Sequence, residues 1–188
     1  MTPHDRLLTL LAARSARRGT FTLASGRQST LYIDARLTTM SPEGLASIGP
    51  LALAAIADQG WRPDAVGGLT LGADPVSYAI AYASALAGTP VRAFTVRKEA
   101  KAHGTGKLIE GPFREADMVV VIEDVITTGG SALKAIAAVR AAGATVLGVM
   151  AVVDREEGGC EAIAAAGVRA ISLARATDIV ARMGAARE

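Results

Sequence analysis

An acidic pair stands at the end of an unbroken apolar run. Glu123 and Asp124 follow the run Met118–Ile122, and residues 125–131 then read Val-Ile-Thr-Thr-Gly-Gly-Ser. Glycines let a backbone approach a ligand closely, and N–H groups at a helix start bind phosphate together with Thr and Ser hydroxyls. Carboxylates beside such a turn suit sugar hydroxyls, or a metal ion held through water. The pattern favours a phosphosugar site over an ordinary strand–turn–helix with capping hydroxyls.

A second cluster of charged residues lies upstream, in a segment with little apolar periodicity. Residues 97–104 read Arg-Lys-Glu-Ala-Lys-Ala-His-Gly. A loop with several cations and a histidine can close over a pyrophosphate group and neutralise it as it leaves. Alone, this segment would be a solvated basic loop, but the acidic turn beside it favours a functional role. We expect a mobile loop at about residues 98–113.

Composition excludes several classes of protein. The chain has 188 residues, of which 51% are hydrophobic, and a formal net charge of +2, so no general attraction to nucleic acid is expected. No apolar run reaches the roughly 18 residues of a membrane span, and residues 1–11 lack the pattern of a signal peptide. Cys160 is the only cysteine, so no intrachain disulfide can form. We therefore expect a cytoplasmic protein without a membrane partner.

The elements that must position the two clusters alternate along the chain. Short Val/Ile/Leu runs are separated by Ala-rich stretches, with Gly or Pro between them. We expect helices at residues 42–59, 73–86, 131–142 and 159–166, and strands at residues 65–69, 91–96, 118–122, 145–153 and 168–173. This alternation predicts an α/β domain with a mostly parallel twisted sheet flanked by helices. Functional sites in such sheets lie at the carboxyl ends of the strands.

The acidic turn and the basic loop together resemble two motifs of the orotate phosphoribosyltransferases, which belong to the type I phosphoribosyltransferases. The apolar run, acidic pair and Thr-x-Gly turn are similar to the phosphoribosyl pyrophosphate motif of that family, and residues 97–104 are similar to its mobile catalytic loop. Residues 21–34, Phe-Thr-Leu-Ala-Ser-Gly-Arg-Gln-Ser-Thr-Leu-Tyr-Ile-Asp, are similar to the N-terminal segment that forms part of a hood over the base. The resemblance extends from Phe21 to Leu173.

The resemblance implies a fold, a reaction and an assembly. The fold is one phosphoribosyltransferase domain over residues 1–188, with a small hood built from about residues 1–40 and the C-terminal part. The reaction is the Mg²⁺-dependent transfer of ribose 5-phosphate from 5-phosphoribosyl 1-pyrophosphate (PRPP) to orotate, which gives orotidine 5′-monophosphate and pyrophosphate in pyrimidine biosynthesis. The family works as a homodimer whose active sites are shared across the interface. Two alternatives stay open: a transferase for another base, and a non-catalytic regulator that senses PRPP.

The resemblance also assigns roles to individual residues. Lys101, His103 and Asp124 are expected to be catalytic. The residues expected to hold PRPP are Arg97, Lys98, Lys101, His103, Glu123, Asp124, Val125, Ile126, Thr127, Thr128, Gly129, Gly130 and Ser131. Orotate is expected to contact Thr127, Arg155, Tyr32 and Ile33, since a guanidinium matches a carboxylate bidentately. The protein is expected to provide no metal site of its own, because Mg²⁺ is held mainly through the substrate.

Two positions depart from the family pattern. Many members carry Lys where this chain has Ala24, and many carry Lys where it has Leu71. Each departure removes a cation near the base or the pyrophosphate. Contacts from residues 69–73 to pyrophosphate are then expected to come from backbone N–H groups.

Overall fold

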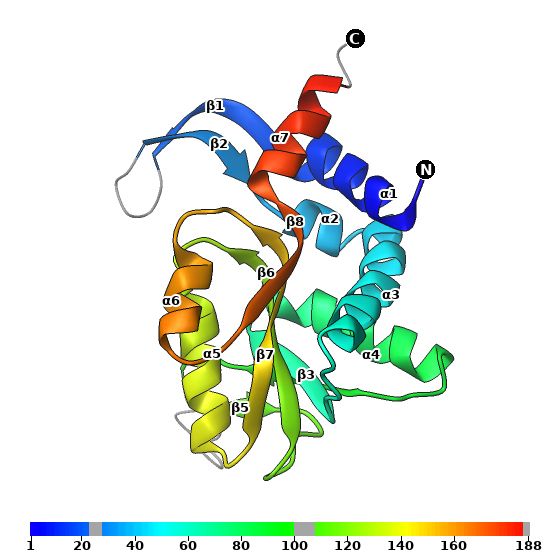
Figure 1. The fold of residues 1–188 in the computed structure, drawn as a ribbon, viewed down its shortest axis with the longest axis vertical. Helices are drawn as coiled ribbons and strands as arrows, with labels where there is room; N and C mark the ends of the chain where they lie inside the picture. The colour runs from blue at the N-terminus through cyan, green and yellow to red at the C-terminus, as the bar shows by residue number, and fades with distance from the viewer. Residues whose placement is uncertain (23–27, 100–107, 186–188) are drawn as a thin grey trace.

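The centre of the fold is a six-stranded sheet in the order β5-β4-β3-β6-β7-β8 (Figure 1). The structure is a computed structural model and describes residues 1–22, 28–99 and 108–185. The strands of this sheet are β3 (Ala65–Leu69), β4 (Arg92–Val96), β5 (Ile109–Glu110), β6 (Met118–Ile126), β7 (Thr145–Asp154) and β8 (Ala170–Arg175). All pairs are parallel except β4 with β5. The expected mostly parallel α/β sheet is confirmed.

Helices cover both faces of the sheet. On one face lie α3 (Pro42–Asp58) and α4 (Ala73–Leu86), and on the other lie α5 (Gly130–Ala141) and α6 (Gly159–Ala165) (Figure 1). The central strand β6 divides the core between them, because successive side chains of a strand point to opposite faces. Val120 and Ile122 join the cluster on the α3 and α4 side, whereas Val119 and Val121 join the cluster on the α5 and α6 side. An unbroken apolar run is therefore the composition that this strand requires.

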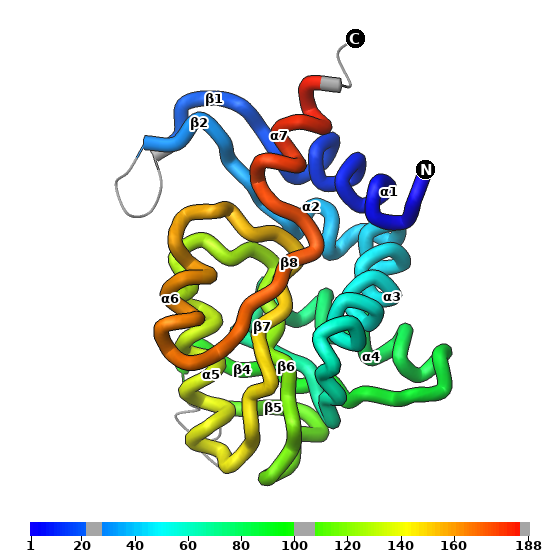
Figure 2. Tube along the Cα trace, viewed as in Figure 1, coloured from blue at the N-terminus to red at the C-terminus, as the bar shows by residue number. Residues whose placement is uncertain are grey.

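The segments at the two ends of the chain meet at one end of the molecule (Figure 2). They are α1 (Pro3–Leu10), the π-helical turn η1 (Leu11–Ser15), β1 (Ala16–Thr22), β2 (Gln28–Ile33), α2 (Arg36–Thr39) and α7 (Ala176–Ala185). Strands β1 and β2 form an antiparallel hairpin. Arg182 on α7 pairs with Asp5 on α1 at 2.6 Å, and Arg18 on β1 donates to the carbonyl of Val180 at 3.2 Å. These contacts fasten the hairpin and the two terminal helices to one another.

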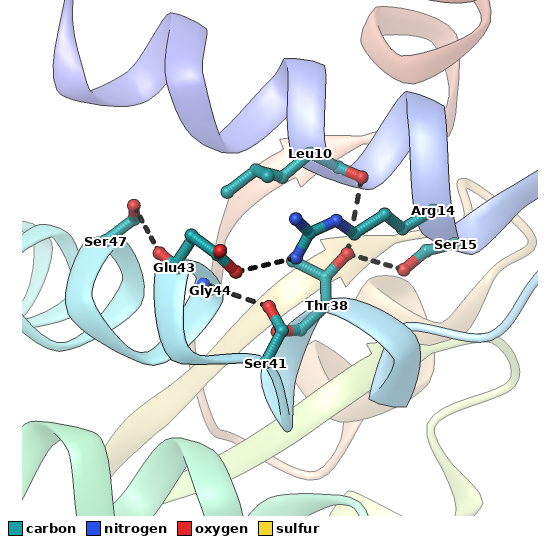
Figure 3. A network of polar contacts seen from close by, with 8 residues as sticks. All are labelled: Leu10, Arg14, Ser15, Thr38, Ser41, Glu43, Gly44 and Ser47. Atoms are coloured by element: carbon teal, nitrogen blue, oxygen red, sulfur yellow. Dashed lines mark hydrogen bonds and ion pairs between the residues drawn. The ribbon is translucent and has the colours of Figure 1, made fainter.

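A polar junction fixes the N-terminal segment onto α2 and α3 (Figure 3). The buried hydroxyls of Ser15 and Thr38 share a hydrogen bond of 2.7 Å. Ser41 is the N-cap of α3, as its sequence predicts, and accepts an N–H bond from the first turn at 3.1 Å. Arg14 pairs with Glu43 at 2.8 Å. The junction holds α2 in place where the chain leaves β2.

Three features differ from expectation by more than one residue. Strand β6 continues through the acidic pair to Ile126, because Val125 pairs with Val153 and Ile126 pairs with Asp154 on β7. The expectation that the strand ends before Glu123 was wrong. The short strand β5 lies inside the segment expected to be a loop, and the last strand lies two residues later than expected. Within the described ranges, no helix combines the length and apolar character needed to cross a membrane.

Candidate active site

A cleft of about 320 Å³ opens at the carboxyl edge of the sheet. Four neighbouring strands contribute to it: Lys98 follows β4, residues 69–72 lie at the end of β3 and just after it, the acidic pair lies on β6 with its turn after it, and Arg155 follows β7. The opposite wall comes from residues 32–36, at the end of β2 and the start of α2. Parallel strands thus bring together residues that are far apart in the sequence.

The turn after β6 forms a smaller hollow beside the cleft. It has a volume of about 90 Å³ and is lined by Glu123 and by residues 125–132. Gly129, with φ at 79°, is the N-cap residue of α5, and no side chain caps this helix. The hydroxyls of Thr127, Thr128 and Ser131 make no hydrogen bond to any described residue. These hydroxyls therefore do not serve as caps, and together with the helix N-terminus they suit an anionic ligand.

The acidic pair lies in the floor of the cleft, with Glu123 buried and Asp124 partly buried. Glu123 is 4% exposed, and its Oε1 atom has no hydrogen-bond partner among the described residues. Burial, and next the neighbouring charge of Asp124, raise the pKa of Glu123 to about 8. Burial also raises the pKa of Asp124, although the N–H group of Val125 donates to its carboxylate at 2.8 Å and opposes the rise. At neutral pH, Glu123 is therefore mainly protonated in the ligand-free protein.

Arg155 and β2 form the end of the cleft nearest the hairpin. The Arg155 side chain is 7% exposed and pairs with Glu157 at 2.7 Å. Tyr32 is 40% exposed, and its ring lies 5.4 Å from that of Phe21, centroid to centroid. The side chain of Ile33 is buried in the core, so only its backbone can serve a ligand. The structure thus brings Arg155, Tyr32, Ile33 and Thr127 to one cleft.

The basic segment is only partly described. Lys98 lines the cleft. Arg97 is not among the described residues that line it, and instead pairs with Glu110 on β5 at 3.6 Å. Lys101 and His103 lie outside the described residues, as does Ala24. Their assigned roles stay predictions.

Two charged residues of the cleft wall were not expected from the sequence. Arg36 and Asp34 both line the cleft, and they pair through two contacts, at 2.8 Å from Nε and at 3.0 Å from Nη2. Leu71 is 55% exposed in the same cleft, so the position where many members carry Lys faces the ligand space. The sequence places Arg36 two residues after the segment that resembles the hood. That position alone does not predict that the side chain reaches the carboxyl edge of the sheet.

No family model matches the chain. Comparisons with individual proteins and with solved structures agree with each other. The chain is 44% identical over 183 residues to orotate phosphoribosyltransferase of Aquifex aeolicus, with 96% of this chain and 99% of that protein covered. It is 47% identical over 178 residues to orotate phosphoribosyltransferase of Thermosynechococcus vestitus, with 94% of this chain and 93% of that protein covered. The crystal structure of Mycobacterium tuberculosis orotate phosphoribosyltransferase with 5-phospho-alpha-D-ribosyl 1-diphosphate has a TM-score of 0.80 and 42% identity, and covers 95% of this chain and 99% of that one. Identity at this level over nearly the whole length shows that the chain belongs to the orotate phosphoribosyltransferase family.

Proposed function

We propose that this chain transfers ribose 5-phosphate from PRPP to orotate and releases orotidine 5′-monophosphate and pyrophosphate. The observation that carries the proposal is one cleft that contains an acidic pair, a phosphate-sized hollow and a buried arginine. In the reaction, the bond from the anomeric carbon to pyrophosphate breaks, and pyrophosphate leaves with the electron pair. A new bond forms from that carbon to a ring nitrogen of orotate. The transition state is oxocarbenium-like, as in other glycosyl transfers.

The sugar phosphate binds at the turn after β6. The 5′-phosphate occupies the hollow beside residues 127–131, where N–H groups at the start of α5 and unbonded hydroxyls face an anion. Asp124 and Glu123 accept hydrogen bonds from the ribose hydroxyls and orient the ring. The raised pKa of Glu123 supports this role, since a neutral carboxyl both donates and accepts.

The pyrophosphate leaves towards the cationic side of the cleft. Lys98 lines this side. Arg97, Lys101 and His103 complete the set by resemblance to the family. A Mg²⁺ ion would add positive charge to the departing pyrophosphate, and the carboxylate of Asp124 is an oxygen ligand of the kind that it takes. Among the described residues, no group of three or more His, Cys, Asp or Glu side chains could hold a metal ion.

The base binds at the opposite end of the cleft. Arg155 pairs with the carboxylate of orotate, and Thr127, Tyr32 and the backbone of Ile33 border the ring. A buried guanidinium that lines the cleft favours a carboxylated base over neutral purines. This argues against the transferase for another base. Lys98, which lines the cleft, argues against the non-catalytic regulator, because a regulator could lose its catalytic cations.

The chain acts as a homodimer with shared active sites. Tyr78, Tyr82 and Leu86 on α4 are 54%, 69% and 73% exposed, and their spacing of four residues places them on one face of the helix. An exposed apolar stripe of this kind is typical of an interface. Leu71, which lines the cleft, precedes the same helix. A subunit packed on this stripe would lie close to the mouth of the cleft.

One assay tests the reaction directly. Loss of orotate absorbance is followed with PRPP and Mg²⁺, and uracil, adenine and hypoxanthine are run in parallel. In the presence of PRPP, we expect turnover with orotate and none with uracil, adenine or hypoxanthine. Turnover with a purine and none with orotate would replace the proposed base, and PRPP binding without turnover on any base would point to the regulator.

A further inference from the structure

Arg155 is held from two directions by groups that belong to the protein. Its Nη2 atom pairs with the carboxylate of Glu157 at 2.7 Å. The same atom donates to the carbonyl of Leu31 at 3.0 Å and to the hydroxyl of Ser29 at 3.3 Å, both on β2. One corner of the guanidinium is therefore fixed between the loop after β7 and the hairpin.

The ion pair between Arg155 and Glu157 is largely shielded from water. The two side chains are 7% and 15% exposed. A buried guanidinium is costly unless a carboxylate compensates its charge, and this compensation requires close geometry. Glu157 is not among the described residues that line the cleft, whereas Arg155 is. Glu157 thus reaches the ligand space, on the described residues, through its contact with Arg155.

We propose that Glu157 is the positioning residue for base recognition, which holds the Arg155 guanidinium in the orientation that receives the carboxylate of the base. The inference rests on the proposed function in one respect, that Arg155 pairs with orotate. A guanidinium is planar, so its donors reach a carboxylate only when that plane is aimed at the ligand. The contacts to Glu157 and to β2 fix that plane before the ligand arrives, so that less ordering is needed on binding.

The test measures KM for orotate and for PRPP, together with kcat, in four variants. They are Glu157→Ala, Glu157→Gln, Arg155→Ala and the double variant Arg155→Ala with Glu157→Ala. Glu157→Ala should raise the KM for orotate about tenfold, as for the loss of one charged contact, while the KM for PRPP stays near the parent value. Glu157→Gln should raise it less, because the amide oxygen keeps a polar contact with Nη2 although the charge is lost. In the Arg155→Ala background, the loss of Glu157 should have no further effect on the KM for orotate.

Glu156→Gln is the matched control. Glu156 is an exposed neighbour whose carboxylate accepts an N–H bond from Thr177 at 3.0 Å on α7. This variant should keep both KM values.

Several results would overturn the inference. A lower KM for orotate in Glu157→Ala would mean that Glu157 competes with the substrate for Arg155. An equal rise in both KM values, or a further rise in the Arg155→Ala background, would mean a general structural role. If Glu157→Ala does not fold, Glu157→Gln decides, and a parental KM for orotate in that variant rejects the inference. Failure of the proposed function looks different, since Arg155→Ala would then leave the KM for orotate unchanged.

Discussion

The carboxylate of Asp124 lies directly against the backbone of Gly72. A Cβ atom added at Gly72 would lie 2.5 Å from Cγ of Asp124, which is closer than any side chain can approach. Gly72 is the residue before α4, in the loop that follows β3. The absent side chain at this position thus makes room for the carboxylate to which we assign the ribose.

Replacing this glycine should move the carboxylate without unfolding the protein. We predict that Gly72→Ala lowers kcat/KM for PRPP by about 10²-fold, as expected when a catalytic group is displaced by about an ångström. The melting temperature should stay within a few degrees of the parent. Gly184→Ala is the control, because nothing lies within 4 Å of a Cβ at Gly184. Parental kinetics in Gly72→Ala would show that the position of Asp124 is not critical.

The protonation of Glu123 should make stability depend on pH. Its pKa in the folded protein is about 8, against an ordinary value of 4.5, so the folded state binds this proton more tightly than the unfolded state does. The stability that this proton provides is full below pH 4.5 and is lost as the pH rises through 8. We predict that Glu123→Gln, which cannot ionise, melts well above the parent at pH 9 and close to it at pH 5.

Melting curves at pH 5, 7 and 9, recorded without ligand and with a chelator, check the prediction for Glu123. Glu161→Gln, at an exposed position on α6, provides the comparison and should show no such trend. The same difference in melting temperature at all three pH values would mean that Glu123 is already ionised.

Arg36 should contribute to the binding of PRPP. It is a cation of the cleft wall, which also contains the uncharged Leu71. We predict that Arg36→Ala raises the KM for PRPP by about three- to tenfold, the effect of one partly solvated charged contact. The exposed Arg62, whose side chain donates to the carbonyl of Trp61, is the control as Arg62→Ala. An unchanged KM for PRPP would assign Arg36 only to its pairing with Asp34.

Lys101 should act on the transition state rather than on the fold. It lies outside the described residues, so this prediction rests on the sequence. We predict that Lys101→Ala melts near the parent temperature but loses kcat by about 10²-fold, as for the removal of one group that stabilises developing charge.

If the loop serves the neighbouring subunit, mixing should restore activity. Lys101→Ala subunits are combined with Asp124→Asn subunits, each nearly inactive alone. A mixed dimer holds one site with both defects and one with neither, so an equimolar random mixture should recover about a quarter of the parental activity. Mass spectrometry establishes that mixed dimers form. Mixed dimers without activity would show that each loop serves its own subunit.

Much of the sheet could be read from the sequence because its signals are local. Helix α4 has the predicted bounds, 73–86, since Gly and Pro residues flank an Ala-rich stretch. The end of β6 could not be predicted, because Glu123 and Asp124 look like the end of a buried strand. Pairing with β7 keeps them inside it, and burial raises the pKa of both carboxyl groups. Here, tertiary pairing outweighs the preference of charged residues for loops.

Some of the described cleft residues could be predicted from the sequence, and others could not. The turn at residues 127–131 and Arg155 follow strands, so a parallel sheet predicts that they meet. Arg36 and Glu157 could not be predicted. Arg36 lies on α2, which a hydrogen bond between Ser15 and Thr38 ties to the N-terminal segment. Glu157 matters only through a contact with a guanidinium whose other partners are more than a hundred residues away in sequence.

The bond from Arg155 to the carbonyl of Leu31 also connects ligand occupancy with the local unfolding of the hairpin. When β2 opens, that bond breaks and Arg155 loses one of the groups that aim it. A carboxylate ligand that needs Arg155 in place therefore makes the opening rarer by mass action. Backbone amides of β2 would then exchange their hydrogens more slowly as the base site fills, which makes the hairpin an internal reporter of occupancy even when no product is formed.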